Sequence, residues 1–293
     1  MKLFLLLIKT GIQLLSLIAP KQAANLAFDL FQKPQNRSFK ANEKAFYAKT
    51  KPLTLKSKLG TICYYEQGSD KDDLVLLVHG WESNAGSMSA IAEAVSQKGY
   101  RVVSIDLPAH GLSKEKRMNP KLAGSHVLDL LAHLNPTQPF SIVSHSLGSM
   151  ITAYNLGRTT YKINQLIYLT APRNMESIFV EYKSIIGIND KAYKMMVELG
   201  SNLLNDTLEN VDTKIGTAKI DYRKLSFVHD RFDKMLDFTN SEGLVKALPN
   251  STLYPFEKIG HYRMLFNPDV IALICQILRD NPLEHEDSPT AST

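Results

Sequence analysis

Cysteine and tryptophan are scarce in this chain, whose 293 residues include only Cys63, Cys275 and a single tryptophan. Two cysteines in different predicted elements cannot build the disulfide framework of a small secreted domain, so we expect a reducing compartment. The sequence also lacks the H-E-x-x-H and C-x-x-C patterns of common metal sites, and it has no internal repeat. We therefore expect no metal and no other cofactor.

Long apolar runs are missing as well. The most apolar stretch is residues 3–19, which as a helix would extend about 25 Å, less than the roughly 30 Å hydrocarbon core of a bilayer. Lys9 interrupts this stretch and Pro20 follows Ala19, which makes a poor secretory signal. An anchor, a signal and a packed helix all remain open. We expect cytoplasmic localisation, with attachment to a membrane as the alternative.

Acidic residues are rare in the first 58 positions, where eleven Lys or Arg stand against two acids. A basic, partly apolar leader is typical of segments that contact an anionic membrane surface. The alternative is a packed helix over residues 20–34 followed by a solvated linker. No nucleic-acid recognition motif accompanies the charge, so we expect no nucleic-acid partner.

Short apolar segments alternate with helical patterns through the rest of the chain. The predicted strands are residues 60–65, 74–79, 101–106, 140–145, 165–170, 225–229 and 251–256. This alternation predicts an α/β fold with a mainly parallel sheet flanked by helices. Residues 172–224 show helical spacing without a strand and are predicted to form a helical cap. The polar residues 281–293 are predicted to be a disordered tail.

The pentad S-H-S-L-G at 144–148 joins the strand at 140–145 to a helical pattern. A serine held on such a sharp turn can act as a nucleophile, and the turn needs small residues on both sides. Gly148 satisfies this need, while Ser144 stands where the usual G-x-S-x-G pattern has glycine. The pentad therefore makes Ser146 the candidate nucleophile.

Two upstream loops accompany the pentad. The strand at 74–79 runs into His-Gly-Trp at 79–81, and the strand at 101–106 passes into D-L-P-A-H-G-L-S at 106–113. The backbone N–H groups of Trp81 and Leu147 are the expected oxyanion hole. The order of the three motifs resembles that of the α/β-hydrolase fold, in particular its serine hydrolase and esterase-like bacterial members. The resemblance covers about residues 60–280.

The resemblance implies that an acid and then a histidine follow the nucleophile. Asp233, in the turn after the strand at 225–229, matches the acid position, and Asp230 is the alternative. His261 follows Gly260 in a loop that resembles the histidine loop of the family. In this arrangement Ser146 attacks, His261 transfers the proton and the acid orients the histidine. His79 and His110 are expected to order the loops around the site.

The interpretation is a serine hydrolase that cleaves an ester or related acyl bond of a small molecule, and the class is carboxylic ester hydrolase. Its expected parts are a leader at 1–58, a core at 59–171 and 225–280, and the cap at 172–224. Two alternatives stay open, namely a non-catalytic binding or scaffolding protein on the same fold, and a hydrolase of peptide or carbon–carbon bonds. The sequence does not indicate the oligomeric state.

Overall fold

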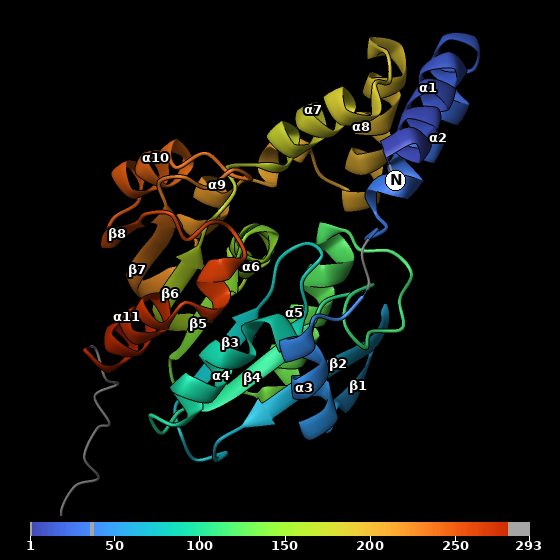
Figure 1. Cartoon of the computed structure of the whole chain (residues 1–293). Helices are drawn as coiled ribbons and strands as arrows, with labels where there is room; N and C mark the ends of the chain where they lie inside the picture. The colour runs from blue at the N-terminus through green and yellow to red at the C-terminus, as the bar shows by residue number, and fades with distance from the viewer. Residues whose placement is uncertain (1, 36–37, 281–293) are drawn as a thin grey trace, which may run out of the picture.

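The computed structural model describes residues 2–35 and 38–280, and within them an eight-stranded sheet forms the centre of the molecule (Figure 1). The strands are β1 Leu53–Ser57, β2 Gly60–Gln67, β3 Leu74–Val78, β4 Arg101–Asp106, β5 Phe140–His145, β6 Lys162–Leu169, β7 Asp221–Asp230 and β8 Ser251–Phe256. Their order across the sheet is β1-β2-β4-β3-β5-β6-β7-β8. Only β2 runs antiparallel to its neighbours among these strands. The predicted α/β-hydrolase fold is confirmed.

Helices cover both faces of this sheet. They are α1 Lys2–Ile18, α2 Pro20–Phe31, α3 Ala41–Lys49, α4 Ser89–Ser96, α5 Pro120–Leu134, α6 Leu147–Leu156, α7 Met175–Ile186, α8 Asp190–Leu204, α9 Thr213–Thr217, α10 Thr239–Ala247 and α11 Pro268–Arg279, with 3₁₀ helices η1 Ala85–Met88, η2 Leu208–Asn210 and η3 Arg263–Phe266. Leu76 and Val78 of β3 share one apolar cluster with α5, α6 and α10. Val75 and Leu77 point the other way and pack with α4 and α11. Because both faces are covered, β3 is buried throughout, which explains its unbroken apolar sequence.

Four helices form an arm that projects from the sheet, namely α1, α2, α7 and α8 (Figure 1). The interior of the arm includes Ile12 of α1, Ala27 of α2 and Phe179 of α7, all buried. Met150 and Tyr154 of α6 belong to the same apolar cluster. The arm therefore rests on the helix that directly follows Ser146.

The edge of the sheet differs from the sequence-based boundaries. We expected the core to begin at residue 59, yet β1 begins at Leu53 and pairs with β2. This edge strand is mostly exposed and has no apolar run, so no pattern marks it. In the same leader, residues 41–49 form α3 instead of a linker. The predicted tail at 281–293 lies outside the described residues.

The first two helices of the leader, α1 and α2, follow one another directly. No helix in the described ranges is long and apolar enough to cross a bilayer. Helix α1 has 17 residues, and α2 packs against α8 through the apolar interior of the arm. The packed helix predicted at residues 20–34 corresponds to α2, which packs with α7 and α8 in the arm.

Candidate active site

Ser146 occupies the single residue between β5 and α6. Its backbone has φ 52° and ψ −126°, a conformation that residues other than glycine rarely adopt. The N–H of Ser146 donates to the carbonyl of Leu169 at 2.9 Å, which fixes this reversal against β6. Strain of this kind persists only where the surrounding structure enforces it, and it is typical of functional sites.

Small residues allow the turn to sit against the end of β3. A Cβ atom on Gly148 would lie 2.4 Å from the carbonyl oxygen of His79, and one on Gly80 would lie 2.8 Å from Cβ of Ser146. Both contacts are too short for any side chain. Ser144 is fully buried and its Oγ has no hydrogen-bond partner among the described residues. The serine in place of the usual glycine is thus accommodated inside the core.

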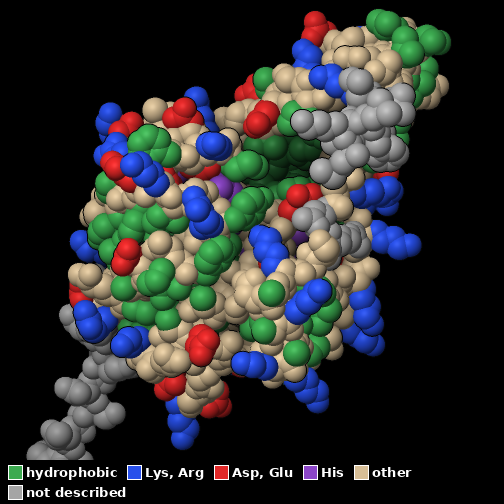
Figure 2. All heavy atoms as spheres, in the orientation of Figure 1, with side chains coloured by type: hydrophobic (Ala, Val, Ile, Leu, Met, Phe, Trp, Pro, Cys, Tyr) green, Lys and Arg blue, Asp and Glu red, His purple; other side chains and the backbone are tan. Residues whose placement is uncertain are grey.

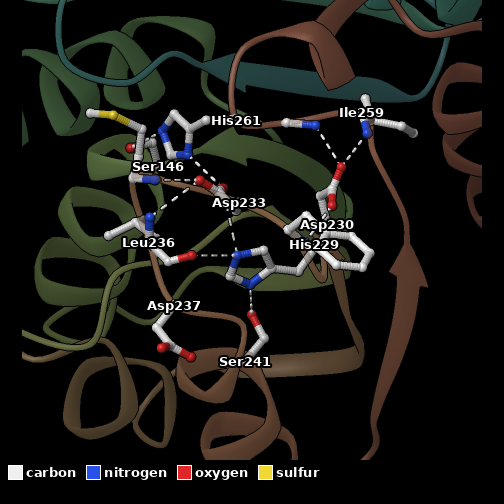
Figure 3. A network of polar contacts seen from close by, with 12 residues as sticks. Ser146, His229, Asp230, Asp233, Leu236, Asp237, Ser241, Ile259 and His261 are labelled. Atoms are coloured by element: carbon white, nitrogen blue, oxygen red, sulfur yellow. Dashed lines mark hydrogen bonds and ion pairs between the residues drawn. The ribbon is translucent and has the colours of Figure 1, made fainter.

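Three side chains from separate loops meet at this turn (Figure 3). His261 Nε2 lies 3.0 Å from Ser146 Oγ, and His261 Nδ1 lies 2.8 Å from Asp233 Oδ2. This geometry suits the neutral tautomer in which Nδ1–H donates to the carboxylate and Nε2 accepts the serine hydroxyl. The side chains of His261 and Asp233 are 5% and 0% exposed, whereas Ser146 is half-buried and open to a substrate.

Asp233 is held by donors from several directions. Its Oδ1 accepts the N–H groups of Met235 at 2.7 Å and Leu236 at 3.2 Å. His229 Nε2 lies 3.6 Å from Oδ2 on the side away from His261. Burial by itself would raise the pKa of Asp233, but the hydrogen bonds from His229 and His261 outweigh it and hold that pKa below its ordinary value. The group is therefore a carboxylate at neutral pH.

Asp230 has different partners. Its carboxylate accepts the N–H groups of Phe232 at 2.7 Å and Gly260 at 2.5 Å, and also that of Ile259. These bonds tie the end of β7 to the loop that carries His261. Of the two candidate acids, Asp233 is the one that contacts the histidine, and Asp230 fixes the loop beside it.

A second histidine, His145, lies against His261 with ring centroids 4.8 Å apart. Its Nε2–H donates to the backbone carbonyl of His261 at 3.0 Å. Burial, and then the nearby His261, lower the pKa of His145 to about 3. His145 is therefore a neutral ring that holds the histidine loop in place.

His79 and His110 order the upstream loops, as predicted. His79 Nδ1–H donates to the carbonyl of Gly80 at 2.7 Å, while its Nε2 accepts the N–H of Leu107 at 2.9 Å. His110 Nε2 accepts the N–H of Glu82 at 3.0 Å. Each ring thus links the loop after β3 to the loop after β4.

The two expected oxyanion donors belong to Leu147 and Trp81. Leu147 directly follows Ser146 as the first residue of α6, where a backbone N–H has no partner within the helix. Trp81 follows Gly80, whose backbone lies close to Ser146. None of the hydrogen bonds between described residues is donated by either N–H.

His229 is the residue near the site that sequence reasoning undervalued. The sequence motifs assigned it no role, and its side chain is fully buried. Besides its contact with Asp233, its Nδ1 lies 2.8 Å from Ser241 Oγ and its Nε2 lies 3.2 Å from the carbonyl of Leu236 (Figure 3). The four-residue spacing of His229 and Asp233 at the end of a strand was the available signal.

Comparisons with known proteins agree with this architecture. Residues 69–210 match the family described as serine aminopeptidase, S33. A serine hydrolase-like protein of Dictyostelium discoideum is 29% identical over 101 residues, which cover 32% of this chain and 27% of that protein. The match thus spans about a quarter of that relative's length.

Solved structures extend the likeness to most of the chain. The thioesterase domain of the curacin biosynthetic pathway is 17% identical with a TM-score of 0.59, covering 78% of this chain and 98% of that one. A putative lipase of Acinetobacter baumannii is 16% identical with a TM-score of 0.62, covering 83% and 95%. At these identities the likeness establishes the fold. The chain therefore has the α/β-hydrolase fold, and the curated relatives it matches are serine hydrolase-like proteins.

Proposed function

We propose that this protein is a serine hydrolase that cleaves a carboxylic ester or related acyl bond through an acyl-enzyme. The observation that carries the proposal is the continuous contact from Ser146 through His261 to Asp233, with steps of 3.0 and 2.8 Å. Serine is a weak nucleophile until a base accepts its proton, and this contact supplies the base and the group that orients it.

In the proposed reaction, Ser146 Oγ bonds to the carbonyl carbon of the substrate as His261 Nε2 takes the hydroxyl proton. The Asp233 carboxylate stabilises the resulting imidazolium, and the N–H groups of Trp81 and Leu147 stabilise the negative charge on the former carbonyl oxygen. The bond to the leaving group then breaks, and His261 gives it the proton. Water, activated by the same histidine, releases the acid and restores Ser146.

Apolar surface beside the nucleophile favours an apolar acyl group. A hollow lined by hydrophobic side chains opens between the arm and the body, with histidine atoms visible at its margin (Figure 2). The apolar cluster that joins α6 to the arm includes Leu147, Met150 and Met175. Met150 and Met175 are fully buried, so of these three it is the half-buried Leu147, directly after Ser146, that can contact an apolar acyl group.

A peptide bond is the second candidate, because the matching family is described as a serine aminopeptidase. An aminopeptidase must bind the ammonium group of its substrate, which calls for acidic groups in the pocket. Amino-acid p-nitroanilides compared with p-nitrophenyl esters therefore separate the two substrates.

A screen of p-nitrophenyl esters of graded acyl length, run beside a fluorophosphonate label, tests the proposal. We expect turnover, and we expect peptide mapping to place the label on Ser146 and not on Ser144. If the folded protein hydrolyses none of the esters and takes up no label, the chain is instead a binding or scaffolding protein.

A further inference from the structure

Large apolar side chains are exposed at the outer end of the arm (Figure 2). Leu17 is 72% exposed and Ile18 is 85% exposed, the two highest values for large apolar residues within 9–35 and 38–280. Leu14, one turn earlier in α1, is 56% exposed, and Ile185 at the end of α7 is 61% exposed. We call these four residues the docking edge.

The exposure follows from the way α1 is fixed on the arm. Ile12 and Ser16 are buried, and the Ser16 carbonyl accepts the side-chain N–H of Asn189 at 2.7 Å. At 3.6 residues per turn, Leu14, Leu17 and Ile18 lie on the opposite side of the helix. The helix is therefore anchored by one face and presents an ordered apolar face outward.

The charges of residues 1–28 have a single sign, whereas on the α7 and α8 side of the docking edge Lys183 is paired with Asp190 at 2.5 Å and Glu181 is exposed. Residues 1–28 contain Lys2, Lys9 and Lys21 and no acidic residue. The first acid, Asp29, is already ion-paired with Lys33 and Arg117. A second copy of the chain on this face would bring like charges together, whereas anionic lipid headgroups complement them.

We propose that the docking edge binds the surface of an anionic membrane, with α1 lying in the plane of the interface. Its 17 residues give a helix of about 25 Å, too short to span a bilayer but suited to lie along one. The docking edge is at the outer end of the arm and α6 is at its inner end, so docking would join the protein to the membrane through the arm and does not depend on the proposed function (Figure 1).

Vesicle co-sedimentation of the full chain carrying Ser146→Ala tests docking without any catalysis. We expect stronger binding to vesicles of phosphatidylcholine mixed with phosphatidylglycerol than to phosphatidylcholine alone. The double variant Leu17→Gln/Ile18→Gln should weaken binding about tenfold, because two apolar side chains no longer leave water. Both side chains are exposed, so the fold should be unaffected.

Two further variants sharpen the result. Leu59→Gln/Phe266→Gln removes two half-exposed apolar side chains elsewhere, which are 49% exposed each, and should bind like the parent. Lys21→Gln should weaken binding about fivefold at low salt. That difference should disappear at high salt, where charges are screened beyond about 3 Å.

Equal binding by the parent and Leu17→Gln/Ile18→Gln would overturn the proposal. The proposal would also be overturned if the parent does not bind vesicles but forms a dimer that Leu17→Gln/Ile18→Gln dissociates. The docking edge would then bind a second copy of the chain. With Ser146 intact, hydrolysis of p-nitrophenyl acetate should be the same in the parent and the double variant. Vesicle binding without any ester hydrolysis would leave the docking edge standing and remove the proposed function.

Discussion

The acid turn beside His261 and the projecting arm are stabilised in opposite ways. In the turn, the carboxylates of Asp230 and Asp233 accept hydrogen bonds from backbone and side chains, and His229 is buried between polar partners. In the arm, the interior is apolar, and aromatic rings such as Phe31 and Phe179 pack with centroids 4.6 Å apart.

This difference separates two tasks. Hydrogen bonds fix atoms at set distances and angles, which proton transfer requires. Burial of apolar surface stabilises the folded arm without requiring set distances and angles, so it does not constrain the outer surface of the arm. Substitutions in the turn should therefore alter kcat more than stability, and substitutions inside the arm should do the reverse.

The largest expected effect is on catalysis, from Asp233→Asn. An amide in this position favours the wrong tautomer of His261 and cannot stabilise the imidazolium, so kcat should fall by about 10⁴. Steady-state hydrolysis of the best p-nitrophenyl ester measures it.

Asp230→Asn is the matched control for this change, with the same chemistry three residues away. It should reduce kcat far less and lower the melting temperature, because Asp230 binds the backbone of residues 259 and 260. The reverse ranking of the two variants would move the acid role to Asp230.

In the arm, Phe179→Ala should lower the free energy of unfolding by about 3–5 kcal/mol, the usual cost of deleting a buried aromatic ring. Phe179 is 2% exposed and contacts Phe28 and Phe31. Denaturant unfolding measures the loss, and Val180→Ala, at a position 49% exposed, should be nearly neutral. A fall in p-nitrophenyl acetate turnover with unchanged stability would show that the arm belongs to the catalytic machinery.

The sequence predicted the central strands well because their burial on both faces leaves a clear apolar record, as in β3. It missed β1, whose edge position leaves its side chains exposed. It also left Asp230 and Asp233 as alternatives, since Asp230 ends β7 and Asp233 lies three residues later, and only the approach of residues 259–261 distinguishes their partners.

The arm could not be read from the sequence for a different reason. The segment Leu3–Ile8 is apolar at every position, so its pattern fits an anchor, a signal or a packed helix equally. The association of α1 and α2 with α7 and α8 depends on contacts between residues more than 150 positions apart, such as the Tyr182 hydroxyl with the carbonyl of Ala27. No local pattern records such contacts.

Buried neutral histidines should make stability depend on pH. Burial lowers the pKa of His126, as it does for His79 and His145. Each ring takes up its proton at a lower pH in the fold than in the unfolded chain, where histidine titrates at about pH 6.5, so its contribution is complete above that pH and declines as the pH falls. The decline is at most about 1.4 kcal/mol per pH unit for each histidine.

His126 lies away from Ser146 and its ring nitrogens have no hydrogen-bond partner among the described residues. His126→Gln removes one titrating group, so the slope of unfolding free energy between pH 6.5 and 5 should become shallower, as urea titrations at each pH can measure. An unchanged slope would mean that His126 takes up its proton in the folded protein as readily as in the unfolded chain.

The smallest expected effect returns to the acid turn and concerns His229. Because His229 lies behind Asp233 and away from Ser146, it should position the carboxylate without touching substrate. His229→Phe keeps a ring but removes the Nε2–H that lies 3.6 Å from the Asp233 carboxylate and 3.2 Å from the Leu236 carbonyl, so kcat should fall at most about tenfold, with KM unchanged. His229→Gln, which keeps a donor, should recover part of the loss. If both variants lose stability equally and neither changes kcat, His229 only fills the core. The residues of the turn that serve catalysis would then not include His229.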